Sequence, residues 1–235
     1  MIPLLGSIDP FPPVDRALDD PNGLLAAGGG LTLERLRDAY SRGIFPWFGD
    51  GDPVLWWSPD PRMVLEPSHF HVSRSLGRRL RKADYHVTAD CAFRDVLREC
   101  AGPRRDQNGT WLVPAMMRAY ERWHHAGDAH SIEVWIDKTL IGGVYGVALG
   151  RMFFAESMFS RRTDASKIAL AYLTAQLERW RFPLIDCQMR TSHLASLGAR
   201  EIPRRQFVKT VERLVKDPGR SGRWQLDGDL AGTWG

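Results

Sequence analysis

The chain has 235 residues, of which 43% are hydrophobic and 26% are charged, and its formal net charge is +4. This composition is typical of a globular protein and allows one large domain or two modest ones. The three cysteines form no Cys-x-x-Cys pair, which argues against a disulfide framework or a zinc ribbon and favours a reducing cytoplasm. No apolar run is long enough to span a membrane, so we expect no membrane association. The weak positive charge is compatible with an anionic partner such as RNA.

The first sixty residues are rich in Pro, Gly and Trp, and they contain one predicted helix, over residues 32–42. Thr32 is a suitable N-cap, and apolar residues recur at helical spacing, at Leu33, Leu36 and Tyr40. The stretch WWSPDPR, residues 56–62, reads as a stiff connector because each proline fixes its own φ and biases its predecessor. We therefore expect two domains, 1–62 and 63–235.

The larger region predicts an α+β fold. Helices are expected over 73–82, 92–100 and 114–126. Alternating residues then predict a three-stranded antiparallel meander over 131–136, 140–149 and 152–158. A helix that Asp164 should cap follows, then a short apolar strand over 183–188 and a helical turn before Ser196. Three strands, helix, strand, helix is the order of an acyltransferase core.

Two polar residues interrupt the last apolar strand. Asp186 and Gln188 are two positions apart, so a regular strand would present both on one face and Cys187 on the other. A carboxylate in an apolar strand is costly unless it is paired, which favours a functional role. A structural role for Asp186, as a cap for a turn at the strand end, is equally compatible with the spacing.

Glu156 is the only carboxylate in the strongly apolar segment FFAESMF. It would share a strand face with Met158. It is a candidate for the site, or else for a structural salt bridge with Arg161 or Arg162.

A basic run occupies the first helix of the larger region. Its positive residues are Arg74, Arg78, Arg79, Arg81 and Lys82. All but Arg79 share one helical face, a stripe that suits a phosphate backbone. A merely solvated charged face is the alternative.

Eight stretches then become specific when they are taken together. They are PNGLLAAGGGL, YSRGIFPWF, WWSPDPR, HSIEVW, AESMFSR, ASKIAL, LIDCQ and SLGAREIPR. In this order, over about residues 20 to 207, they resemble the signature blocks of bacterial leucyl/phenylalanyl-tRNA–protein transferases. The resemblance implies a small N-terminal domain joined to a GNAT-like (acyl-CoA N-acyltransferase-like) domain.

The resemblance also implies an activity. Leucine or phenylalanine, and methionine as a further donor, would pass from aminoacyl-tRNA to the N-terminal α-amine of proteins that begin with Arg or Lys, which marks them for N-degron degradation. The donor ester is already activated for aminolysis, so we expect no cofactor and no metal. We also expect a cytoplasmic monomer.

The implied site has three parts. Asp186, Gln188 and Glu156 would lie in the catalytic centre, where Asp186 attracts the cationic acceptor and Gln188 orients the amine or the ester. For Glu156 three roles stay open: binding the acceptor's basic side chain, contacting the terminal adenosine, or acting as base. Substrate-assisted proton transfer is compatible too. The implied donor side-chain pocket consists of Trp47, Trp111, Val144, Met158 and Ile185. The five basic residues of the run would bind tRNA.

Three other functions fit the sequence less well. An acetyl-CoA-dependent N-acetyltransferase needs a glycine-rich pyrophosphate loop, but residues 160–166 contain no glycine. An aminoacyl-tRNA-using peptide-bridge enzyme of cell-wall synthesis shares the domain type but not the blocks. A non-catalytic RNA-binding module would leave Glu156 and Asp186 without a purpose.

Overall fold

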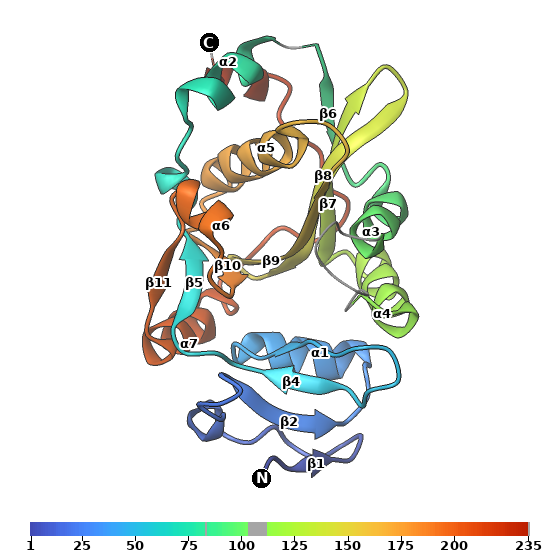
Figure 1. The fold of residues 1–235 in the computed structure, drawn as a ribbon, viewed down its shortest axis with the longest axis vertical. Coiled ribbons are helices and arrows are strands. Elements are labelled where there is room, and N and C mark those ends of the chain that lie inside the picture. The colour runs from blue at the N-terminus through green and yellow to red at the C-terminus, as the bar shows by residue number, and fades with distance from the viewer. Residues whose placement is uncertain (83, 103–111, 235) are drawn as a thin grey trace.

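The computed structural model describes residues 1–82, 84–102 and 112–234. It contains two β-sheets that lie at different levels of the long axis of the molecule (Figure 1). The N-terminal part of the chain forms the smaller sheet at one end, and the rest of the chain builds a larger sheet with helices on both faces.

The smaller sheet has four short strands in the order β1-β2-β4-β3. Their bounds are β1 Leu4–Leu5, β2 Leu24–Gly28, β3 Phe45–Pro46 and β4 Leu55–Trp57. Helix α1, Leu33–Ser41, is capped as predicted by Thr32, whose hydroxyl accepts a hydrogen bond from the Arg35 amide at 3.2 Å. It buries Leu36, Ala39 and Tyr40, so the helical spacing seen in the sequence is the buried face.

The larger sheet has seven strands in the order β11-β5-β10-β9-β8-β7-β6. Their bounds are β5 Arg62–Leu65, β6 His86–Ala89, β7 Ala129–Ile136, β8 Thr139–Leu149, β9 Met152–Ser160, β10 Leu184–Gln188 and β11 Arg200–Ile202. Strands β9 and β10 are parallel neighbours, and the predicted meander β7-β8-β9 is confirmed. The sequence patterns did not predict β5, β6 or β11, which are short and pair with partners distant in the chain.

Helices cover both faces of this sheet. Their bounds are α2 Arg74–Lys82, α3 Phe93–Ala101, α4 Pro114–His125, α5 Ala165–Arg179, α6 Ser192–Ser196 and α7 Arg204–Leu214. Helix α5 packs on one face of β7 and β8, and α3 and α4 pack on the other (Figure 1). The predicted α+β fold class is thereby confirmed. Within the described part of the chain, no helix has the length and apolar character needed to cross a bilayer.

The start of α5 is where we expected it, but the expected cap is absent. Asp164 precedes the helix with a φ of +65°, and its side chain makes no capping hydrogen bond. It accepts instead from Nζ of Lys167 at 2.8 Å. The prediction that the Asp164 side chain caps this helix is therefore wrong, because its carboxylate is paired with Lys167.

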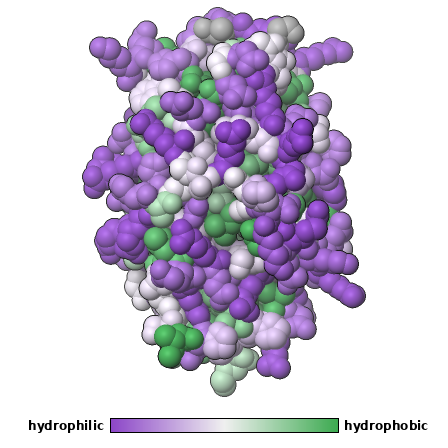
Figure 2. All heavy atoms as spheres, turned by 180° about the vertical axis from the view of Figure 1, so that it is seen from behind, coloured by the Kyte–Doolittle hydropathy of each residue, from purple (hydrophilic) through white to green (hydrophobic). Residues whose placement is uncertain are grey.

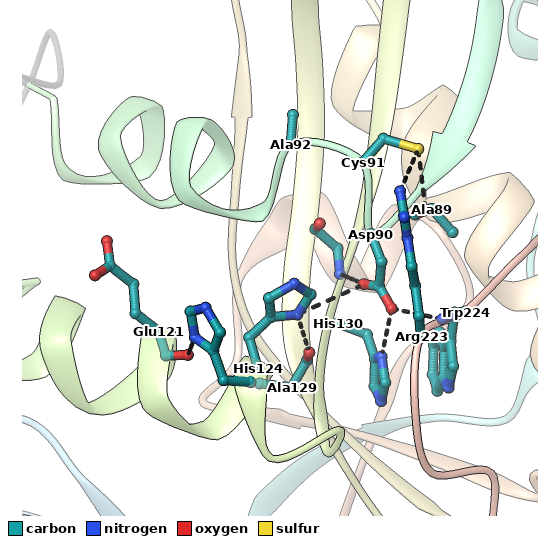
Figure 3. Close-up of polar contacts among 12 residues, drawn as sticks. Ala89, Asp90, Cys91, Ala92, Glu121, His124, Ala129, His130, Arg223 and Trp224 are labelled. Atoms are coloured by element: carbon teal, nitrogen blue, oxygen red, sulfur yellow. Dashed lines mark hydrogen bonds and ion pairs between the residues drawn. The ribbon is translucent and has the colours of Figure 1, made fainter.

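The segment after α7 lies beyond the eight signature stretches, yet Trp224 within it is buried in the core. The Trp224 amide donates to Oδ2 of Asp90 at 2.7 Å, and its ring stacks on His130 with centroids 3.8 Å apart (Figure 3). His130 lies 2.8 Å from the same Asp90 oxygen through Nδ1. This cluster packs the segment after α7 against the start of β7.

Exposed large hydrophobic side chains are few among the described residues. They are Met1, Leu4, Ile8, Trp47 and Met189. Seen from behind, the surface carries only small separate hydrophobic groups among hydrophilic residues (Figure 2). Two of the five, Trp47 and Met189, belong to the pocket described below.

Candidate active site

A pocket of about 410 Å³ opens where β9 and β10 separate. The two strands pair from Met152 opposite Leu184 to Phe154 opposite Asp186. Beyond that point β9 continues beside β8 alone, while β10 ends at Gln188. The pocket occupies this gap. Its walls come from β9, from the end of β10, from β3 and from α6.

The structure brings together most of the residues that the sequence singled out. Five of them line the pocket: Trp47, Val144, Glu156, Met158 and Gln188. Trp47 is 38% exposed, so it stands at the mouth. Asp186 and Ile185 are fully buried beneath the lining. Ile185 packs in the same hydrophobic cluster as Val144. Trp111 lies outside the described residues.

Strict strand alternation fails at the end of β10. The register shifts between Asp186 and Gln188, and Gln188 has a φ of +61°. Because of this bulge, Cys187 and Gln188 both line the pocket while Asp186 does not, so the prediction that Asp186 and Gln188 share one face is wrong. Burial raises the pKa of the Cys187 thiol, which keeps it protonated and unsuited to act as a nucleophile.

Asp186 is held by Arg62, which lies in the stretch that the sequence predicts to be a connector. Nε of Arg62 donates to Oδ1 at 2.8 Å and Nη2 donates to Oδ2 at 2.6 Å. Both side chains are about 1% exposed. The backbone N–H of Gln188 also donates to Oδ1, at 2.9 Å. A single arginine just before the buried run MVL was the available signal, because a buried carboxylate needs such a partner.

Glu156 is bound by two tyrosines rather than by an arginine. The hydroxyl of Tyr40 donates to Oε1 at 2.6 Å, and the hydroxyl of Tyr120 donates to Oε2 at 2.7 Å. Both tyrosines lie on helices that the sequence predicts, α1 and α4, but no sequence pattern indicates their contact with Glu156. Arg161 pairs elsewhere, with Glu99.

Burial raises the pKa of Glu156 from its ordinary value of 4.5 to about 7. The hydrogen bonds from Tyr40 and Tyr120 act in the opposite direction, while the nearby charge of Asp186 raises the pKa further. Glu156 can therefore gain or lose a proton near neutral pH, as a general acid or base must.

The number of protons in this cluster depends on the state of Glu156. The two tyrosine oxygens are also 2.9 Å from each other, so three short contacts join three groups. Two hydroxyl protons fill only two of these contacts when Glu156 is ionised. A third proton on Glu156 completes a ring in which each group donates once and accepts once. Burial raises the pKa of both tyrosines, so their hydroxyls stay protonated throughout.

His193 on α6 is another titratable group of the pocket wall. Burial, with the neighbouring positive charge of Lys167, lowers its pKa. It is therefore largely uncharged at neutral pH. Among the described residues, no group of three or more His, Cys, Asp or Glu side chains could hold a metal ion.

The predicted tRNA-binding run forms α2, at the opposite end of the long axis from the smaller sheet (Figure 1). Leu76 and Leu80 anchor it, and Arg74, Arg78, Arg81 and Lys82 are exposed. Arg79 differs because it pairs with Asp84 and covers the ring of Tyr85 at 4.9 Å. Lys82 lies 3.2 Å from Asp84 as well.

Two solved structures share a general likeness with this fold. A GCN5-related N-acetyltransferase from Kribbella flavida matches 72% of this chain and 59% of its own, with 13% identity and a TM-score of 0.35. L-PGS from Bacillus licheniformis matches 86% of this chain and 68% of its own, with 13% identity and a TM-score of 0.37. At these TM-scores neither structure informs the function of this chain.

Sequence comparison is far more specific. The family model named leucyl/phenylalanyl-tRNA protein transferase matches residues 64–212, and the model of its N-terminal domain matches residues 29–60. A leucyl/phenylalanyl-tRNA–protein transferase of Nitrosospira multiformis is 59% identical over 227 residues, which cover 97% of this chain and 98% of the relative. One of Nitrosomonas europaea is 58% identical over 227 residues, covering 97% and 96%. The chain therefore belongs to the leucyl/phenylalanyl-tRNA protein transferase family of aminoacyltransferases.

Proposed function

We propose that this aminoacyltransferase moves leucine, phenylalanine or methionine from tRNA to the N-terminal α-amine of proteins that begin with Arg or Lys, which marks them as N-degrons. We expect it to act in the cytoplasm as a monomer. The observation that carries the proposal is the pocket itself. Its apolar walls end at one carboxylate, Glu156, and one amide, Gln188, as expected for a site that holds an apolar side chain beside a reacting ester.

The donor side chain is proposed to lie against Val144 and Met158, with Trp47 at the mouth. A flexible thioether and an aromatic face both adapt to a branched or a flat partner, which suits a pocket that accepts leucine, methionine and phenylalanine. Ile185 supports this wall from the layer beneath. We assign Trp111 to the same pocket on the family resemblance alone.

Glu156 and Gln188 are proposed to serve the reaction centre. The acceptor nitrogen attacks the ester carbonyl carbon, a C–N bond forms, and the C–O bond to the ribose breaks. The amine loses one proton and the ribose oxygen gains one. Glu156, with a pKa of about 7, is suited to take the first proton and return the second. The amide of Gln188 is suited to stabilise the developing oxyanion.

An acetyl-CoA donor fits the structure less well. The loop between β9 and α5 lacks the glycines that a pyrophosphate needs. In addition, the hydroxyl of Ser160 already accepts from the Ser166 amide at 3.3 Å and donates to the Arg162 carbonyl at 2.7 Å. The Ser166 amide in the first turn of α5 is thus already bonded to the Ser160 side chain and is not free to bind a pyrophosphate.

The test is mass spectrometry of peptides incubated with the protein and one donor at a time. Leucyl-, phenylalanyl- and methionyl-tRNA should extend peptides that begin with Arg or Lys, and matched peptides that begin with Ala or Asp should stay unmodified. Isoleucyl- and valyl-tRNA should be roughly 10- to 200-fold poorer donors, because branching at Cβ places a methyl group beside the ester carbonyl. Acetylation from acetyl-CoA, with no aminoacyl product from any charged tRNA, would overturn the proposal.

A further inference from the structure

We infer that Arg62 is a positioning residue of the transfer site. It fixes the two walls of the pocket relative to each other without lining the pocket itself. The inference rests on the proposed function, because it concerns the geometry of that same transfer. It also gives Asp186 an indirect role, through Gln188, in place of a contact with the acceptor.

One arm of Arg62 reaches the β10 wall. Its Nε and Nη2 donate to the two oxygens of Asp186, and Oδ1 also accepts a hydrogen bond from the backbone N–H of Gln188. Gln188 has a left-handed φ of +61°, which is unfavourable for a residue with a Cβ unless its surroundings hold it there. The Asp186 carboxylate is such a restraint, and Arg62 fixes that carboxylate in turn. The Gln188 side chain reaches the pocket from this restrained backbone.

The other arm of Arg62 reaches the wall contributed by the N-terminal part. Nη1 donates to the carbonyl oxygen of Gly43 at 3.1 Å. The guanidinium also lies 4.7 Å from the ring centroid of Phe45 and 4.5 Å from that of Phe207. Phe45 lines the pocket and is followed there by Pro46 and Trp47. One buried guanidinium therefore touches both walls.

Burial decides between an indirect and a direct role for Asp186. The carboxylate accepts three hydrogen bonds from its neighbours, and its side chain is about 1% exposed. An acceptor amine could reach it only by displacing Arg62, whose fork matches the carboxylate in two parallel bonds. Asp186 thus acts as the link between Arg62 and Gln188.

The first experiment separates positioning from acceptor binding. Arg62→Lys keeps the charge but loses the two-pronged geometry, and Asp186→Asn keeps the shape but loses the charge. Each variant should lower kcat by about 10- to 100-fold, because misplacement of a reacting group by about 1 Å has effects of that size. KM for an Arg-initiated peptide should change by less than about twofold. The double variant should lose little more than the worse single variant, since both disturb one unit.

Arg37→Lys is the matched control. Arg37 joins Asp128 at 2.7 Å across two distant segments, but this pair is partly exposed and does not line the pocket. It should leave kcat and KM unchanged. Thermal unfolding of every variant, with rates expressed per folded molecule, removes loss of folding from the comparison.

The pH profile separates the charge of Arg62 from its two-pronged geometry. The groups that face Glu156 are Tyr40 on α1, Tyr120 on α4, and Asp186 and Gln188 on β10. Asp186→Asn removes a negative neighbour, so the midpoint of the rate against pH should move to lower pH. Arg62→Lys keeps the charge balance, so the midpoint should stay. Arg62→Met leaves Asp186 uncompensated, so the midpoint should move to higher pH. The acceptor amine contributes equally to all of these profiles.

A binding measurement keeps this inference separate from the proposed function. The probe is a phenylalanyl-adenosine amide that cannot react, and its Kd should be about tenfold weaker in Arg62→Lys than in the unaltered chain or in Arg37→Lys. If the unaltered chain binds the probe but transfers no amino acid, the proposed function fails and the Kd comparison still decides the role of Arg62. Unaltered kcat and Kd in Arg62→Lys would overturn the inference. So would a more than tenfold rise in KM for the peptide, with kcat unchanged, in Asp186→Asn.

Discussion

Tyr40 on α1 donates a hydrogen bond to Oε1 of Glu156 on β9 at 2.6 Å, although the two residues are 116 positions apart in the sequence. The N-terminal part of the chain thus supplies a proton-bearing group to the pocket in addition to the wall of Phe45 and Trp47. Tyr120 on α4 supplies the second such group. The pocket is therefore assembled from both parts of the molecule.

Tyr40→Phe and Tyr120→Phe should each shift the pH dependence of transfer to higher pH. Each tyrosine hydroxyl lowers the pKa of Glu156, so its loss should raise that pKa above about 7. At pH 7 a larger fraction of Glu156 would then be protonated, and kcat should fall about tenfold, the worth of one hydrogen bond to a charged group. Rates measured from pH 5.5 to 9 check this. Tyr85→Phe is the control, because Tyr85 donates to the Leu80 carbonyl instead. A profile that moves to lower pH would contradict the expectation.

Glu156→Gln should abolish most transfer and yet stabilise the chain at alkaline pH. The folded chain keeps a proton on Glu156 up to about pH 7, whereas the unfolded chain releases it near pH 4.5. Stability from this group is therefore present below pH 4.5 and is lost as the pH rises through 7. At about 1.4 kcal/mol per pKa unit the loss is roughly 3 kcal/mol. Denaturant unfolding at pH 5 and pH 8.5 should show a clearly larger gain of the variant over the unaltered chain at the higher pH.

Replacing Arg74, Arg78 and Arg81 together by Ala should weaken tRNA binding and flatten its salt dependence. Each lost phosphate contact should reduce the slope of log affinity against log salt by about 0.7 to 0.9. Arg79→Gln, on the same helix, should barely change the slope, because Asp84 already compensates the Arg79 charge. The slope is measured by titration between 50 and 300 mM salt. Equal slopes for the triple variant and the unaltered chain would make α2 a merely solvated face.

Met158→Ala should relax donor choice before it reduces turnover. Met158 lines the pocket from β9 next to the gap, so truncation makes room for a Cβ-methyl group. The preference for leucyl- over isoleucyl-tRNA should fall by roughly tenfold, within the range that one methyl group contributes. Competition between the two donors in one reaction measures this ratio directly. An unchanged ratio with normal activity would remove Met158 from the donor pocket.

Trp224→Ala should destabilise the chain by about 3–5 kcal/mol, the usual cost of deleting a buried aromatic side chain. Trp224 is 3% exposed and stacks on His130. Transfer at low temperature should persist because Trp224 does not line the pocket. Gln225→Ala is the neighbouring exposed control. Loss of activity without loss of stability would show that this segment does more than pack.

Local patterns predicted much of the fold. The spacing of Leu36 and Tyr40 marks the buried face of α1, and the alternation after Ser131 marks the meander. Both signals depend on near neighbours in the chain. Strands β5 and β11 have three or four residues each and pair across the sheet. Such short strands carry too few alternations to be recognised without their partners.

The residues of the candidate site also divide into those that local sequence patterns indicate and those that depend on distant contacts. Glu156 and Gln188 stood out because polar groups interrupt apolar strands, and both line the pocket. Arg62 and Tyr120 carried no such signal, since an arginine beside prolines and a tyrosine on a helix have many ordinary explanations. Their roles depend on contacts across 124 and 36 positions of sequence. The bulge at Gln188 depends likewise on the register between β10 and β5.

The gap between β9 and β10 exists because the two strand backbones diverge. It does not arise from small side chains in an otherwise filled core. Replacing the side chains that face it therefore changes its shape while the opening itself persists. Substrate choice in this scaffold can drift, or be redesigned, without rebuilding the sheet. Val144 and Met158 pair across β8 and β9 beside the gap. They are the first positions to substitute in order to extend donor specificity to amino acids outside the standard set.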